Sequence, residues 1–215
     1  VVMSVTISGT DNFVLNADSL GTAAAGAFDY DGKVFYVTPQ GTQRGVVPGA
    51  QFFRLDSGLA GANVSTAQNT FGVGVTLSSS TVYAFEGCIA LTNSAGASTH
   101  TVGLGFGGTA TLNNVIHVVT GIGKNATSGS SDNVAVGFYV NTASNTNTNA
   151  TFASANAFLA LNLKGTVSVN VGGTFTPQYT LSAAPGGAYT TAAGSYFMIY
   201  PIGASGANVN VGTWA

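Results

Sequence analysis

The stretch GTVSVNV, residues 165–171, alternates small or polar residues with valine. Val167, Val169 and Val171 fall on one side of an extended chain, and the polar residues between them fall on the other. This period of two is typical of a β-strand with one buried face. Helical spacing of apolar residues is nearly absent from the rest of the chain, so the pattern predicts an all-β fold.

Similar β-rich runs recur between clusters of Gly, Ser and Asn. They are VMSVTIS, KVFYVT, VVPGAQFFRL, FGVGVTL, STVYAFEGCIAL, HTVGLGF, NVIHVV, NVAVGFYV, AFLALNL, FTPQYTL, SYFMIYPI and NVNVGTW. Short strands at fairly regular spacing, separated by turn residues, indicate an antiparallel β-sandwich or jelly roll. One short helix or turn is also expected around residues 150–157, where alanine is frequent.

The composition leaves little charge for the surface. Only 6% of the 215 residues are charged and the net charge is −2, whereas an ordinary soluble domain is about one quarter charged. The hydrophobic fraction of 45% is high enough to favour folding over disorder. Weak self-repulsion favours an obligate assembly in which copies bury surface against their neighbours. A monomer coated with Ser, Thr, Asn and Gly is the alternative.

Several partners are not expected. The five Lys and Arg residues are scattered, and binding of nucleic acid needs a concentrated positive surface. No apolar run reaches the ~18 residues that span a bilayer, and VVMSVTISGTDN lacks the basic start and apolar middle of a signal peptide. Cys88 is the single cysteine and lies in an apolar run, where we expect a buried thiol without a disulfide.

Charge is concentrated at the start of the chain. Eight of the twelve charged residues precede position 57: Asp11, Asp18, Asp29, Asp31, Lys33, Arg44, Arg54 and Asp56. We therefore predict an N-terminal arm and hairpin region over residues 1–56, which contacts charged neighbours and docks on a partner, and a β-sandwich domain over residues 57–215. Arg44 and Arg54 are candidate contact residues. Chance clustering in a small set of charges is the alternative.

No catalytic, cofactor-binding or metal-binding residue is predicted. His100 and His117, the two histidines, lie in apolar runs without the spacing of a zinc site, and we expect packed or interface side chains. A Ser-His-Asp triad need not be local in sequence, but no G-x-S-x-G turn is present. Glu86, the single glutamate, shares a strand face with Cys88, while Phe85 on the other face is expected in the core. The sequence therefore does not indicate an enzyme.

The stretch FDYDGKVFYVTP, residues 28–39, predicts a hairpin. Asp31-Gly32 is a signal for a two-residue type I′ turn, because both positions need positive φ. The predicted register pairs Tyr30 with Lys33, Asp29 with Val34, and Phe28 with Phe35. Phe28, Tyr30, Phe35 and the stem of Lys33 then share one face, and Asp29 lies on the other. The two carboxylates are directed apart, and the following KVFYV offers no further oxygen ligands, so a calcium loop is disfavoured.

The tract NTASNTNTN, residues 141–149, contains no apolar residue larger than alanine and is expected to be an exposed loop. Tyr139 precedes it, and with Asn145 and Asn147 it forms a candidate surface for a glycan, because aromatic faces beside amides suit sugars. Tyr189 and Trp214 are further aromatic candidates. Tyrosines in a subunit interface are the alternative interpretation.

Three runs carry a resemblance to a known group. They are GTAAAGAFDYDGKVFYVTPQGTQRGVVPGAQFFRL, LKGTVSVNVGGTFTPQYTLS and GSYFMIYPIGASGANVNVGTW. Together they resemble structural proteins of tailed bacteriophage virions, in which a segment like AGAFDYDG-KVFY-TP-RGVVP leads into a β-rich domain.

The resemblance implies a non-enzymatic building block, commonly a homotrimer, that is a capsid decoration or cement protein or a domain of a head or tail fibre. The chain has no extended repeats or heptads, which favours a compact module over a long fibre. We therefore expect a decoration protein bound to the major capsid protein on the outer surface of the virion, with the charged N-terminal region facing the shell. A fibre domain that binds a host surface glycan is the alternative.

Overall fold

The computed structural model describes residues 15–17, 19–93, 100–124, 132–141, 148–154 and 158–214. The chain forms two compact units, one of residues 1–48 with 210–215 and one of residues 49–209. Every regular element in the described ranges is a β-strand, and all strand pairs are antiparallel. The predicted all-β class is therefore confirmed. No described residue of the 150–157 region is helical, since 150–154 belong to a strand and 155–157 lie outside the described ranges.

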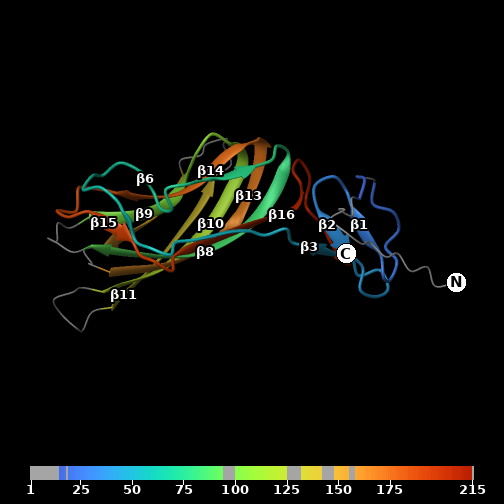
Figure 1. Cartoon of the computed structure of the whole chain (residues 1–215), viewed down its shortest axis with the longest axis horizontal. Coiled ribbons are helices and arrows are strands. Elements are labelled where there is room, and N and C mark those ends of the chain that lie inside the picture. Colours follow the sequence, from blue (N-terminus) through green and yellow to red (C-terminus); the bar gives the residue numbers. More distant parts are fainter. Residues whose placement is uncertain are drawn as a thin grey trace, which may run out of the picture. The chain divides into compact units, whose positions relative to one another are not determined.

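The smaller unit contains one three-stranded sheet. Its strands β1 (Phe28–Tyr30), β2 (Phe35–Val37) and β3 (Gly45–Val47) pair in the order β1-β2-β3 (Figure 1). Val34, Tyr36 and Thr38 are buried. The unit therefore has a small core on one side of the hairpin.

The larger unit contains two sheets. Eight strands form the first: β4 (Gln51–Arg54), β5 (Leu59–Ala60), β8 (Thr81–Asn93), β10 (Thr111–Lys124), β11 (Asp132–Asn141), β13 (Phe158–Val171), β15 (Tyr189–Thr191) and β16 (Tyr196–Ala204). Five form the second: β6 (Gln68–Asn69), β7 (Val75–Leu77), β9 (His100–Gly107), β12 (Thr148–Ser154) and β14 (Gly173–Leu181). The long strands β8, β10 and β13 run side by side in the larger sheet (Figure 1).

The core lies between these two sheets. Phe85 of β8 meets Phe106 of β9 edge to face, with ring centroids 5.0 Å apart. Phe106 in turn stacks on Phe175 of β14 at 4.1 Å. These contacts join the apolar faces of both sheets, so the predicted antiparallel sandwich is confirmed, and the finer jelly-roll topology stays a prediction.

Strand β8 shows why the sequence adopts this arrangement. Burial alternates along it: Tyr83, Phe85 and Gly87 are buried, while Glu86 is exposed and Cys88 is half-buried. The predicted core face is confirmed. Cys88 differs from its expectation of full burial because it lies on the outer face with Glu86.

Strand β13 joins two runs that the sequence suggested as separate strands. AFLALNL and GTVSVNV form a single strand through Gly165, whose backbone approaches β10 closely. A Cβ built at Gly165 would lie 2.0 Å from the Ile116 carbonyl oxygen. Val167 and Val169 are buried as predicted, but Val171 is exposed at the end of the strand. Glycine here marks close packing of two backbones rather than a turn.

On one side of β8, each of the next two strand positions in the sheet is divided between two separate strands. Along one side of β8, β16 pairs with residues 81–88 and β15 with residues 91–93. The next position is occupied by β4, which pairs with β16, and by β5, which pairs with β15. Residues 49–56, placed by the sequence prediction in the N-terminal region, therefore belong to the larger unit.

The remaining runs differ from the expected strands. VVPGAQFFRL is split between β3 and β4, and NVNVGTW contains no strand in residues 208–214. VMSVTIS lies outside the described residues. Asn141 and residues 148–149, expected in an exposed loop, belong to β11 and β12, while residues 142–147 lie outside the described ranges.

Candidate interaction surfaces

The hairpin of the smaller unit has a wider turn than predicted. Tyr30 pairs with Phe35, Asp29 with Tyr36 and Phe28 with Val37, so residues 31–34 form the loop. Gly32 has the expected positive φ of 89°, but Asp31 does not share it, which excludes a type I′ turn. The predicted register is therefore wrong.

The side chain of Asp31 explains the wider turn. Its Oδ1 accepts hydrogen bonds from the backbone N–H groups of Lys33 and Val34, both at 2.8 Å. A two-residue hairpin with Asp31 and Gly32 as its loop would instead direct the Lys33 N–H to the Tyr30 carbonyl oxygen. Aspartate competes with the backbone in this way because its carboxylate is short and lies close to the following amides.

The three rings nevertheless share one face as predicted, and we define Phe28, Tyr30 and Phe35 as the aromatic face. Lys33, whose stem was predicted to lie on this face, belongs instead to the loop. The ring of Phe35 stacks on Tyr30 at 4.5 Å and on Phe28 at 5.7 Å. Phe28 is 50% exposed and Phe35 is 40% exposed, so much of this apolar surface contacts water. Ordered, half-exposed aromatic rings are typical of residues that anchor a protein interface.

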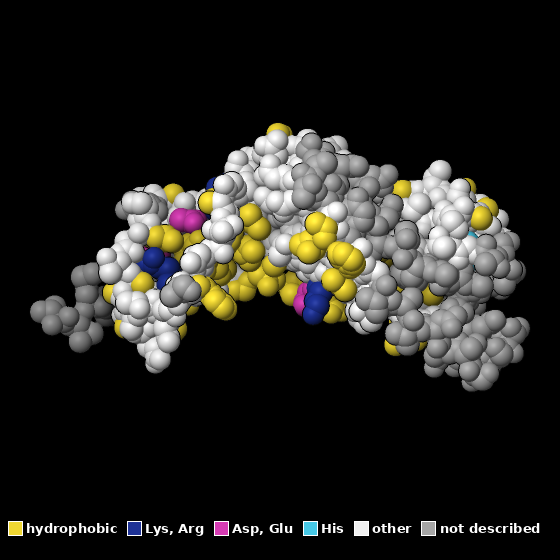
Figure 2. Space-filling view, turned by 180° about the vertical axis from the view of Figure 1, so that it is seen from behind, with side chains coloured by type: hydrophobic (Ala, Val, Ile, Leu, Met, Phe, Trp, Pro, Cys, Tyr) yellow, Lys and Arg dark blue, Asp and Glu magenta, His cyan; other side chains and the backbone are white. Residues whose placement is uncertain are grey.

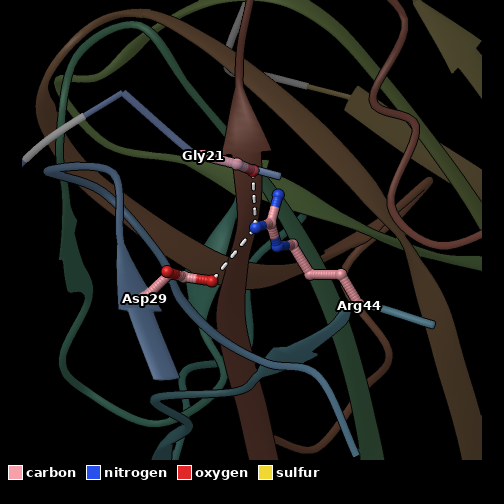
Figure 3. Close-up of polar contacts among 3 residues, drawn as sticks. All are labelled: Gly21, Asp29 and Arg44. Atoms are coloured by element: carbon pink, nitrogen blue, oxygen red, sulfur yellow. Dashed lines mark hydrogen bonds and ion pairs between the residues drawn. The ribbon is translucent and has the colours of Figure 1, made fainter. Parts of the chain in front are cut away.

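The opposite face of the hairpin is polar and internally bonded. The Arg44 guanidinium donates from Nη2 to Asp29 Oδ2 at 3.1 Å and to the Gly21 carbonyl oxygen at 2.8 Å (Figure 3). Only 14% of the Arg44 side chain is exposed. Arg44 thus joins the segment before β1 to β1 itself. Its positive charge is paired with Asp29 inside the smaller unit.

Asp31 and Asp29 have separate partners. Asp31 Oδ2 accepts a hydrogen bond from the Tyr36 hydroxyl at 2.9 Å, whereas Asp29 pairs with Arg44. Partial burial alone would raise the pKa of Asp31, but hydrogen bonds from Val34, Lys33 and Tyr36 outweigh it and lower that pKa. Burial and the bond to Asp31 raise the pKa of Tyr36 to about 12. These features describe a structural network that supports the aromatic face.

Arg54, another predicted contact residue, lies in β4 of the larger unit. It pairs with Asp56, and both side chains are largely exposed. An exposed ion pair of this kind contributes little to stability. Arg54 therefore belongs to a different unit from the hairpin residues.

An apolar cleft beside β4 was not predicted. A cavity of about 210 Å³ lies there, with Phe52, Phe53, Val73, Pro177 and Phe197 among its lining residues. β4 pairs with β16 on one side and with no other described strand. Figure 2 shows one face of the chain, where charged side chains occupy a few spots and hydrophobic side chains form larger patches. The sequence did contain one signal for the cleft. Phe52 and Phe53 are adjacent in a run assigned to a strand, so one of the two rings must lie on the outer face of the sheet.

The predicted glycan candidates are only partly described. Tyr139 pairs through its backbone with His117 of β10, but its side chain, Asn145 and Asn147 lie outside the described part of the structure. Tyr189 is buried, with its hydroxyl 3.0 Å from the His100 ring nitrogen, which removes it from the surface. Trp214 of the smaller unit is 80% exposed.

Both histidines are packed inside the larger unit, as predicted. His117 Nε2 lies 3.2 Å from the Leu104 carbonyl oxygen, and burial lowers the pKa of this imidazole. Within the described ranges, no three His, Cys, Asp or Glu side chains are close enough to hold a metal ion. The described residues also contain no helix long and apolar enough to cross a membrane.

Comparisons with known proteins found no matching family model and no matching curated protein. Among solved structures, a chain in the structure of the infectious bursal disease virus Gx strain is similar, with 6% identity and a TM-score of 0.20 over 78% of this chain. A chain from the Gt strain of that virus has 11% identity and a TM-score of 0.17 over 92% of this chain. This chain covers 46% and 55% of those chains, about half of their length. Similarity at this level carries no argument about function.

Proposed function

We propose that the chain is a non-enzymatic structural protein of a tailed-bacteriophage virion, and specifically a decoration protein bound to the outside of the head. Its partners in this proposal are the major capsid protein and further copies of itself. The resemblance of the three sequence runs implies the virion role, in which the building block is commonly a homotrimer.

One observation of the structure carries the docking part of the proposal. The aromatic face, Phe28, Tyr30 and Phe35, is stacked and half-exposed on a hairpin whose reverse side is fixed by hydrogen bonds. Pre-organised apolar rings lose little entropy on binding, which suits a permanent contact with another protein. Because the chain is only 6% charged, such a contact would rest on apolar burial more than on ion pairs.

The division of the chain into two units supports the same role. The smaller unit carries the proposed docking surface, and the larger unit is a sandwich with long strands and a continuous apolar core. A decoration protein needs a stable β scaffold joined to a surface that binds the shell. We assign these tasks to the larger and smaller units respectively.

Rebinding to undecorated particles tests this proposal. Phage particles assembled without the protein are mixed with the purified full chain and sedimented, with isolated tails as a parallel sample. We expect the chain to sediment with head-containing particles and to saturate at a fixed ratio to the major capsid protein. Chain that stays in the supernatant with heads, or sediments only with tails, would count against the proposal.

A head- or tail-fibre domain that binds a host glycan is the second candidate. The observation that favours it is the exposed indole of Trp214, since a flat aromatic ring can stack on a sugar. A glycan array probed with the full chain and with Trp214→Ala separates the two roles. Binding that is lost in the variant supports the receptor role, and no binding supports the decoration role.

A further inference from the structure

Six residues lie side by side across the outer face of the larger sheet, one on each of six neighbouring strands. From β11 to β4 they are Phe138, Val118, Lys164, Glu86, Met198 and Phe52, and we call them the central row. The opposite face of this sheet packs on the smaller sheet. Among the residues that the structure describes, no further sheet or helix of the larger unit covers the outer face.

The central row is largely apolar and open to water. Phe138 is 69% exposed and Phe52 is 58% exposed, and they stand at the two ends of the row. Next to Phe138, exposed Ile116 and Val140 are cross-strand partners, and exposed Ile122 lies farther along β10. These exposed apolar side chains gather toward the two ends of the row, and exposed apolar patches of roughly 300–600 Å² on a protein are often functional.

The two charges of the row stand at its centre. Lys164 of β13 and Glu86 of β8 are direct cross-strand partners, and both are exposed. On each side of them follow one aliphatic and then one aromatic side chain. The row thus has the same order of residue types from either end, except that the central charges are opposite in sign.

We propose that two copies of the chain associate face to face through this surface, about a two-fold axis parallel to the strands and midway between β13 and β8. Rotation about that axis places Lys164 against the second copy's Glu86, and Glu86 against the second copy's Lys164. It also places Val118 against Met198 and Phe138 against Phe52 across the interface. A two-fold contact is self-complementary in this way when each surface carries both halves of every pair.

The neighbouring row fits the same axis. Val140, Ile116, Thr166, Ala84 and Tyr200 follow one another across the sheet. The rotation brings Thr166 against the second copy's Ala84, and Ile116 against its Tyr200, with no charge facing a like charge. A two-fold axis perpendicular to the strands would instead bring Lys164 against Lys164 and Glu86 against Glu86, which is unfavourable.

The size of the face suits a stable pair. Six strands about 4.8 Å apart, over some nine residues rising about 3.3 Å each, give roughly 800 Å² per copy, the area that a standard protein interface buries. A hollow of about 320 Å³ beside Lys164 and Glu86, lined also by Val118, Thr120 and Tyr196, leaves room for side chains of the second copy. Two charges buried in such an interface require partners, and the pairing supplies both.

Charge reversal and mixing test the pairing. Lys164→Glu gives a copy with two acidic groups at the centre, and Glu86→Lys gives a copy with two basic groups. We expect the wild-type chain to form pairs in sedimentation equilibrium, and each variant alone to associate at least about 100-fold more weakly. An equimolar mixture of the two variants should form one-to-one pairs, because every central contact then joins opposite charges.

Matched controls change charge elsewhere in the chain. Lys33→Glu lies in the smaller unit and Thr76→Lys lies on β7 of the five-stranded sheet, and both should pair like the wild type. The inference is overturned if the wild-type chain is monomeric, if either reversal pairs like the wild type, or if the mixture fails to pair. A three-copy mass that is unchanged by both reversals also overturns it. The inference does not depend on a virion role, so it can fail or hold separately from the proposed function.

Discussion

The carboxylate of Asp31 lies 2.9 Å from the hydroxyl of Tyr36 and at the same time caps the turn of its own hairpin. One side chain thereby joins the loop to the buried face of β2. The aromatic face on the other side of the sheet depends on this connection, because Tyr36 alternates with Phe35 and Val37 along the strand. The polar network and the proposed docking surface are therefore two faces of one hairpin.

Replacing Asp31 by alanine should destabilise the smaller unit by about 1–3 kcal/mol, because two backbone N–H groups and the Tyr36 hydroxyl lose their acceptor. Hydrogen exchange at the Val34 amide of the full chain measures the effect. Asp31→Asn retains an oxygen acceptor and serves as the matched control, with a smaller expected increase in exchange. Equal exchange in wild type and Asp31→Ala would show that the side chain does not hold the turn.

The same network predicts a pH dependence at both extremes. The pKa of Asp31 is lowered in the folded chain, so its stabilising contribution is present above pH 3.8 and is lost as the pH falls through the folded value. The pKa of Tyr36 is raised to about 12, so its contribution is complete below pH 10 and is lost as the pH rises toward 12.

Absorbance titration of the tyrosine hydroxyls at alkaline pH measures the pKa of Tyr36. Comparison with Tyr36→Phe identifies which part of the signal comes from Tyr36. In Asp31→Asn we expect Tyr36 to titrate at a lower pH, since the neighbouring negative charge is removed. An unchanged Tyr36 titration in that variant would contradict the network.

Gly165→Ala should destabilise the larger unit by about 2–4 kcal/mol, because the added Cβ would meet the Ile116 carbonyl oxygen and the Phe85 ring. Gly49→Ala is the matched control, since no atom lies within 4 Å of its added Cβ and its φ is not positive. Chemical denaturation compares the two free energies of unfolding. Equal stabilities would argue against close packing of β10 on β13.

Removal of the aromatic face should abolish docking without unfolding the chain. In Phe28→Ser with Phe35→Ser, both exposed rings are lost, and we expect retention on undecorated particles to fall by roughly 100-fold. Val64→Ser, which removes an exposed apolar side chain from the segment between β5 and β6 of the larger unit, is the control and should bind particles like the wild type. Undiminished binding of the double variant would place the docking surface elsewhere.

The alternation of apolar and polar residues was sufficient to predict the all-β class and the core face of β8. Burial of one face of a sheet requires an apolar side chain at every second residue. It could not show that β13 continues through Gly165, since a glycine at a turn and a glycine under a neighbouring strand look alike in sequence. The hairpin at Asp31-Gly32 was located correctly, but its register was not, because the Asp31 side chain accepts the Lys33 N–H that a two-residue hairpin would direct to the Tyr30 carbonyl oxygen.

The candidate surfaces were predicted less completely than the fold. The grouping of Phe28, Tyr30 and Phe35 follows from strand parity and was predicted. The central row required knowledge of which strands are neighbours, since Lys164 and Glu86 are far apart in sequence and meet through the pairing of β13 with β8. Long-range pairing of this kind has no local signal in a single sequence.

Electron microscopy of intact virions, labelled with antibody against the chain, tests the central claim most directly. The decoration role predicts label distributed over the outer surface of the head, with none on particles assembled without the protein. Label confined to the tail or its fibres, with the head unlabelled, would contradict it.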